Sequence, residues 1–90
     1  MNMDTTTTWD LRAARLKLGI TLRAAGKLAG ASHTTVENWE LGHTAITRGD
    51  TPNKIRRLCR AYMQAAIPLG YNPADFHETI LLPRVFVTVK

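Results

Sequence analysis

Hydrophobic residues recur along most of this chain at the three- and four-residue spacing of helices that bury one face. The first such segment is expected over residues 9–18. Its apolar positions are Leu11, Ala14 and Leu18. Thr8 or Asp10 can cap its start, and Gly19 can end it in the left-handed conformation. The pattern therefore predicts a short amphipathic helix at the beginning of the folded part.

Two more short helices are predicted next, separated by a tight turn. Thr21 can cap a helix over Leu22–Ala29, because its hydroxyl can accept a hydrogen bond from a free backbone N–H. Gly30 can close that helix, and Ser32 is the equivalent cap for a third helix, His33 to about Leu41. The spacing of these residues indicates two helices held close together by the turn.

Gly26 interrupts an otherwise alanine-rich second helix. A glycine in a helix interior costs about 1 kcal/mol of helix propensity relative to alanine, so its presence needs a reason. The absent side chain would let a neighbouring helix approach the backbone closely. We therefore expect another element to pack tightly against Gly26.

The third helix divides into an apolar and a polar face when its residues are placed at 100° intervals. Val36 and Trp39 fall on one side, which we expect to be buried. The opposite side carries Thr34, Glu37, Asn38 and Leu41. Many surface helices show such a split, so the pattern by itself does not specify a function.

A long fourth helix is predicted from Thr51 or Asp50, either of which can cap it, to about Ala66. Pro52 falls in its first turn, where the missing N–H is harmless. The residues expected to face inward are Ile55, Leu58, Cys59 and Tyr62, with Met63 or Ala66. Cys59 is interpreted as a small core residue, because no base partner for thiol chemistry can be placed.

A fifth helix is predicted from Pro73 to about Leu82, with Asn72 as its cap and with Phe76 and Ile80 buried. Pro83 would end this helix. We divide the chain into a flexible tail over residues 1–8, a helical domain over 9–82 and a C-terminal strand over 83–90.

The C-terminal residues RVFVTVK are rich in the β-branched and aromatic types that favour a strand. A single strand is not stable alone. It could pair with a second copy across a two-fold axis, lie along its own domain or form a disordered end, and we favour the pairing. The residues expected to make this dimer contact are Val85, Phe86, Val87 and Val89.

Charge and composition narrow the class of protein. The 12 Lys and Arg residues outnumber the 7 Asp and Glu residues, and the net charge of +5 favours a polyanionic partner such as nucleic acid. The single cysteine cannot form an intramolecular disulfide, and no Cys and His cluster offers a metal site. No signal peptide or membrane-spanning run is present. We expect a soluble cytoplasmic protein with no cofactor, metal, small-molecule ligand or membrane partner.

The run from Leu11 to Gly42 resembles the phage-repressor helix-turn-helix family, also called the Cro-like or XRE family. The matching positions are Leu11, Arg12, Arg15, Gly19, Thr21, Gly30, Ser32, Thr35, Val36, Trp39, Glu40 and Gly42. Gly26 stands where the family prefers a small alanine. The resemblance implies a bacterial or phage-encoded, lambda-repressor-like protein, an all-α bundle of about five short helices whose third helix reads DNA.

The resemblance also assigns roles to residues. The base contacts would be made by Ser32, His33, Thr34, Glu37 and Asn38. We expect phosphate contacts from Thr21, Arg23, Thr44, Arg48 and Lys54. The structural residues would be Gly26, Gly30, Val36 and Trp39, with an ion pair of Arg15 and Glu40 that joins the first helix to the third. Arg56, Arg57 and Arg60 are either further backbone contacts or a solvated helix face.

Two departures from the family pattern affect the details. Leu22 stands where many members have a glutamine, so that phosphate contact is lost and Arg23 can replace it. The family's larger apolar residues are replaced by Ala14, Ala25, Ala29 and Ala31. We expect the core between the first three helices either to be tighter or to be filled by Trp9, Leu28 and Trp39.

The sequence thus predicts a sequence-specific DNA-binding transcriptional regulator, a repressor that binds an inverted repeat in double-stranded DNA as a homodimer. One alternative is a DNA-binding antitoxin that also binds a toxin. Another is a protein-interaction module on the same fold. RNA binding is disfavoured because no exposed aromatic platform is expected. The histidines and acidic residues form no recognisable catalytic site, so the protein is not expected to be an enzyme.

Overall fold

The computed structural model describes residues 10–42 and 49–81, and all regular structure within these two ranges is helical. The elements are α1 (Leu11–Leu18), α2 (Leu22–Ala29), α3 (His33–Leu41), α4 (Thr51–Ala66), the 3₁₀ helix η2 (Pro73–Phe76) and α5 (Glu78–Leu81). The predicted all-α class with five helices is therefore confirmed. The predicted tail, Trp9 and the C-terminal strand with its four dimer residues lie outside the described residues.

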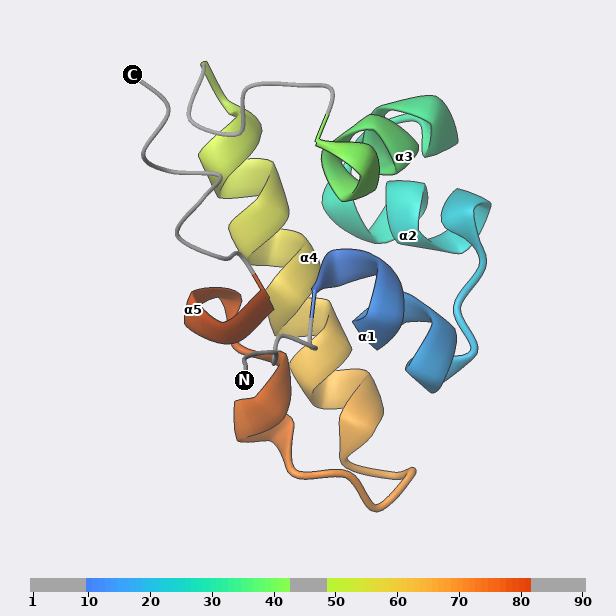
Figure 1. The fold of residues 1–90 in the computed structure, drawn as a ribbon, viewed down its shortest axis with the longest axis vertical. Coiled ribbons are helices and arrows are strands. Elements are labelled where there is room, and N and C mark those ends of the chain that lie inside the picture. The colour runs from blue at the N-terminus through green and yellow to red at the C-terminus, as the bar shows by residue number, and fades with distance from the viewer. Residues whose placement is uncertain (1–9, 43–48, 82–90) are drawn as a thin grey trace, which may run out of the picture.

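Helix α4 is the central element of the fold (Figure 1). Helices α1 and α2 pack on one side of it, and η2 and α5 pack on the other, while α3 packs against α2 and α1. Helix α2 also packs against α3, so these two short helices form a unit that leans on α4. None of the helices in the described ranges is both long enough and apolar enough to span a membrane.

Side chains and glycines set the limits of the first three helices at the predicted places. The carboxylate of Asp10, rather than Thr8, caps α1 by accepting from the N–H of Ala13 at 2.7 Å. The hydroxyls of Thr21 and Ser32 cap α2 and α3 through bonds of 3.1 Å. The left-handed glycines that end these helices are Gly19, Gly30 and Gly42.

Helix α4 starts differently. Asp50 occupies its N-cap position, but the carboxylate makes no capping bond to the backbone. It accepts instead from the side-chain amide of Asn53 at 3.0 Å. Pro52 lies in the first turn, as predicted.

The core joins residues from all the helices. The large, fully buried side chains are Trp39, Tyr62, Phe76, Ile55, Leu58, Leu81, Val36 and Cys59. The inward faces predicted for α1, α3 and α4 are confirmed. The prediction that Leu28 fills the core is wrong, because this side chain is 39% exposed. Large residues of later elements, Tyr62 and Phe76 among them, occupy the interior instead.

The fifth helix was expected to be continuous, and this prediction is wrong. The chain forms η2 and then a single turn, α5, with His77 in an extended conformation between them. This break rotates the following residues about the helix axis, so Leu81 is buried and Ile80 is 41% exposed. The imidazole Nδ1 of His77 accepts from the N–H of Thr79 at 3.1 Å, which stabilises the new start.

Candidate nucleic-acid interface

An ion pair fixes α3 relative to α1. The Nε of Arg15 donates to Oε2 of Glu40 at 2.6 Å, and its Nη2 donates to Oε1 at 3.3 Å. Its Nη1 donates to the carbonyl oxygen of Ile20 at 3.0 Å, in the segment between α1 and α2. The two side chains are only 9% and 2% exposed. Arg15 therefore ties α1 to α3 and to the segment that leads into α2.

The electrostatics around this pair favour its charged form. The hydrogen bond to Glu40 raises the pKa of Arg15, although burial acts in the opposite direction. Burial also raises the pKa of Tyr62 above its usual range, and the nearby negative charge of Glu40 adds to this effect. Tyr62 therefore stays neutral beside the pair, and its hydroxyl has no hydrogen-bond partner among the described residues.

Because one face of α3 is buried in the core, the opposite face of the helix points toward solvent. Val36 and Trp39 are fully buried against the core. Of the side chains assigned to base contacts, those of Ser32, Thr34 and Glu37 are exposed, while those of His33 and Asn38 are half-buried. Leu41 extends this outward surface and is 54% exposed. The outer surface of α3 is therefore polar toward its start and apolar at its end.

Gly26 accounts for the close packing of α2 and α3. A Cβ at this position would lie 2.6 Å from the carbonyl oxygen of Ala31 and 3.2 Å from the backbone nitrogen of His33. Cβ atoms in real proteins essentially never approach another heavy atom so closely. The tight neighbour is thus the turn and the first residue of α3, and a larger residue here would push α3 away from α2.

The predicted phosphate contacts do not all fall within the described residues. Thr21 and Arg23 are exposed at the start of α2, and Lys54 is half-buried in the first turns of α4. The hydroxyl oxygen of Thr21 accepts from the backbone of α2, so its proton remains free to be donated outward. Thr44 and Arg48 lie outside the described residues.

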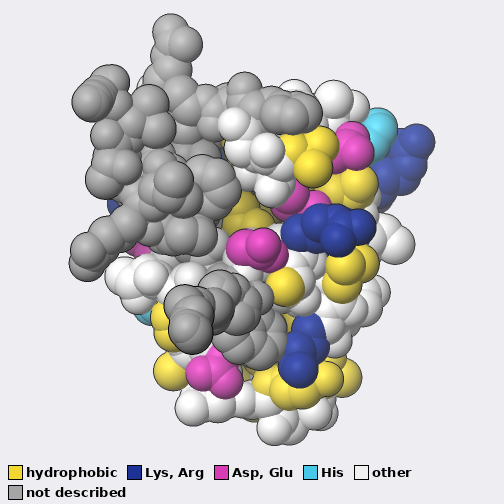
Figure 2. Space-filling view, viewed as in Figure 1, with side chains coloured by type: hydrophobic (Ala, Val, Ile, Leu, Met, Phe, Trp, Pro, Cys, Tyr) yellow, Lys and Arg dark blue, Asp and Glu magenta, His cyan; other side chains and the backbone are white. Residues whose placement is uncertain are grey.

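One basic residue near this surface was left undecided by the sequence. Arg57 of α4 extends over Gly30, which directly follows α2, with its Nη1 3.0 Å from the position of a Cβ on that glycine. Figure 2 shows basic side chains and a histidine along the edge of the molecule where α2 and α3 lie. Spacing within α4 places Arg57 on a flank, but only the packing of α4 on α2 reveals which element it reaches.

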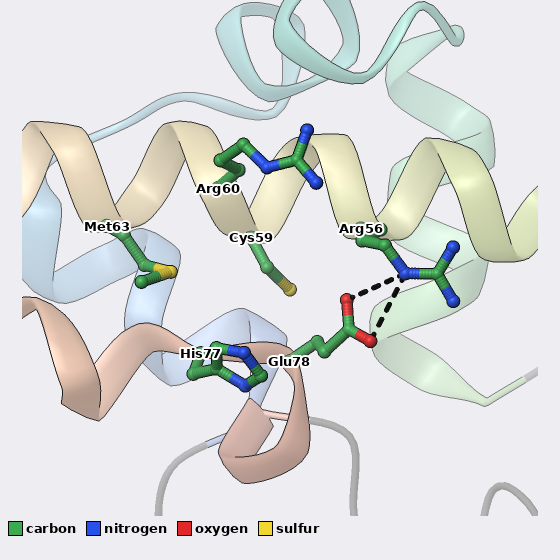
Figure 3. A pocket seen from close by; sticks show the side chains of 6 residues that line it. All are labelled: Arg56, Cys59, Arg60, Met63, His77 and Glu78. Atoms are coloured by element: carbon green, nitrogen blue, oxygen red, sulfur yellow. Dashed lines mark hydrogen bonds and ion pairs between the residues drawn. The ribbon is translucent and has the colours of Figure 1, made fainter.

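The other flank of α4 borders a pocket of about 250 Å³. Its walls are Arg56, Cys59, Arg60, Met63, His77 and Glu78 (Figure 3). The pair of Arg56 and Glu78 crosses from α4 to α5 at 3.2 Å beside it. Burial raises the pKa of Cys59 to about 12, so the thiol stays protonated and is a poor nucleophile. No group of three His, Cys, Asp or Glu residues suited to a metal occurs in the described ranges.

Comparison with known proteins agrees with this geometry. Neither a curated protein nor a solved structure gives a significant match to the chain. A family model described as a helix-turn-helix domain matches residues 9–68, which is more than half of the chain and contains α1 to α4. The chain therefore belongs to the helix-turn-helix domain family.

Proposed function

We propose that this protein is a sequence-specific DNA-binding transcriptional regulator that acts as a repressor. The observation that carries the proposal is the outward face of α3, which presents polar side chains while Val36 and Trp39 hold the helix on the core. A protruding helix fits the DNA major groove, where each base pair has its own pattern of donors and acceptors. The family match and the net charge of +5 support the same function.

The proposed division of labour follows the position of each side chain. His33, Thr34, Glu37 and Asn38 read base edges, with Asn38 suited to a bidentate contact with adenine. Ser32 has a second duty, because its hydroxyl also caps α3 and shares a 2.8 Å hydrogen bond with Thr35. The phosphate contacts are assigned to Thr21, Arg23, Thr44, Arg48 and Lys54.

A homodimer on an inverted repeat is part of the proposal. Two copies of α3 placed about 34 Å apart would enter successive major grooves and read the two half-sites. We assign the dimer contact to Val85, Phe86, Val87 and Val89. Sedimentation of the purified chain tests this part separately, because a monomer in solution that binds a single half-site would contradict it.

Gel-shift titration against the DNA upstream of the protein's own gene, at several salt concentrations, tests the function. We expect binding at least about 10³-fold tighter than to random DNA, with log K falling linearly as log salt rises. Equal affinity for random DNA would exclude a sequence-specific regulator.

A pair of variants then tests the role of α3. Asn38→Ala should weaken operator binding by about 1–3 kcal/mol and relax the preference at one base pair. Gln64→Ala, an exposed amide on α4 far along the helix, is the matched control and should leave binding unchanged. Equal effects of the two substitutions would remove α3 from the reading surface.

A further inference from the structure

Arg57 lies outside the helix-turn-helix unit, yet its side chain rests on the turn of that unit. Its Nη1 is 3.0 Å from the point that a Cβ on Gly30 would occupy. Gly30 ends α2, and Ser32 caps α3 two residues farther along the chain. The guanidinium is therefore held beside the start of the helix that carries the proposed reading face.

The charge of Arg57 is not neutralised by any described acidic residue. The ion pairs found in the described ranges join Arg15 to Glu40 and Arg56 to Glu78, and no hydrogen bond from Arg57 to a described residue is found. A cation is favoured near the C-terminal end of α2, which explains why the side chain rests there. That contact leaves the N–H donors of the guanidinium available to another acceptor.

Lys54 is a second basic residue on α4, one turn closer to the start of the helix than Arg57. It precedes Arg57 by three residues, so the two side chains are neighbours on one flank of the helix. On the other flank, Arg56 is paired with Glu78 and Arg60 borders the pocket beside α5 (Figure 3). Helix α4 therefore presents to the α2–α3 turn a cation without a described acidic partner, and to α5 a neutralised one.

We propose that Arg57 binds a DNA phosphate beside the α2–α3 turn, so that α4 helps to hold the helix-turn-helix unit on the DNA backbone. This inference rests on the proposed DNA-binding function and adds a residue outside the turn-and-helix motif. Arg57 belongs to α4 and not to the outward face of α3, which carries the proposed base contacts. The contact assigned to it is therefore with the backbone, and it contributes affinity without sequence preference.

The test compares Arg57→Gln with the wild-type protein on operator and random DNA over a range of salt concentrations. We expect about tenfold weaker binding to both DNAs, and a slope of log K against log salt that is smaller by about 1, because one fewer counterion is released. Arg57→Lys keeps the charge and should retain most of the slope. Arg60→Gln removes the same kind of charge one turn along α4 and should leave both quantities unchanged.

The melting temperature of each variant distinguishes two roles of Arg57, namely binding of a DNA phosphate and stabilisation of the α2–α3 turn. If Arg57→Gln lowers the melting temperature but leaves the salt slope at the wild-type value, Arg57 only stabilises the turn and the inference is wrong. An equal loss of slope in Arg60→Gln would also overturn it, since the effect would then be one of net charge. If the wild-type protein fails to prefer its operator, the proposed function fails, and that result is distinct from a variant that binds like the wild type.

Discussion

Two ion pairs in the described part of the chain join the same kinds of charged groups under very different conditions. Arg15 and Glu40 connect α1 to α3 across 2.6 Å, with side chains that are 9% and 2% exposed. Arg56 and Glu78 connect α4 to α5 across 3.2 Å, with side chains that are 49% and 28% exposed. Water screens the second pair and is largely excluded from the first.

This difference indicates which of the two ion pairs contributes more to holding its two helices together. Removing one partner of a buried pair leaves a charge without compensation, whereas water readily solvates a charge left at the surface. Arg15 of the buried pair also donates to the carbonyl of Ile20, so it positions the segment that leads into α2 as well as α3. The helix that carries the proposed reading face is thus held by a buried ion pair, whereas α5 is held by Leu81 in the core more than by its exposed ion pair.

The largest effect is expected from Glu40→Ala. It leaves Arg15 buried without its carboxylate, so the free energy of unfolding should fall by roughly 3–5 kcal/mol. The melting temperature should fall by more than about 10 °C, as a domain of this size loses about 4–8 °C per kcal/mol. Thermal unfolding followed by circular dichroism measures this. Asn38→Ala on the outward face is the control and should change stability by about 0.5 kcal/mol or less.

Gly26→Ala should come next. Helix propensity alone predicts a gain of about 1 kcal/mol, but the new Cβ would lie 2.6 Å from the carbonyl oxygen of Ala31. Backbone atoms cannot move aside cheaply, so we expect a net loss of about 1–3 kcal/mol in urea unfolding. A stabilised variant would show that the α2–α3 unit has room to adjust.

Ser32→Ala should destabilise by about 1 kcal/mol, since the N–H of Thr35 loses its acceptor at the start of α3. Chemical denaturation of the variant measures this loss. Ser32→Asp supplies another good capping group and should restore stability. If aspartate fails to rescue, the loss must come from somewhere other than the cap.

Glu78→Ala should have the smallest effect, about 0–1 kcal/mol, because the pair with Arg56 is exposed. A double-mutant cycle on Arg56 and Glu78, set beside one on Arg15 and Glu40, compares the two coupling energies directly. Raising the salt concentration should reduce the coupling energy of Arg56 and Glu78 much more than that of Arg15 and Glu40. Equal coupling energies would contradict the contrast between the buried and the exposed ion pair.

Local sequence determined the helical architecture of α1, α2 and α3. Side-chain caps and left-handed glycines act within three or four residues, so Thr21, Gly30 and Ser32 set the limits of these helices without help from distant parts of the chain. The buried faces of α1, α3 and α4 follow from helical spacing for a similar reason, since a fixed rotation per residue decides which side chains share a face. Gly26 likewise predicted, from the sequence alone, that another backbone segment packs closely against α2.

Only the tertiary structure decided how far each contact is buried and which distant residues meet. The break at His77 exposes Ile80 and buries Leu81, because packing against α4 competes with continuation of a helix that has weak local signals. Leu28 is exposed because the interior is filled by Tyr62 and Phe76 from later in the chain. The reach of Arg57 to the α2–α3 turn depends on the packing of α4 against α2, which no local pattern encodes.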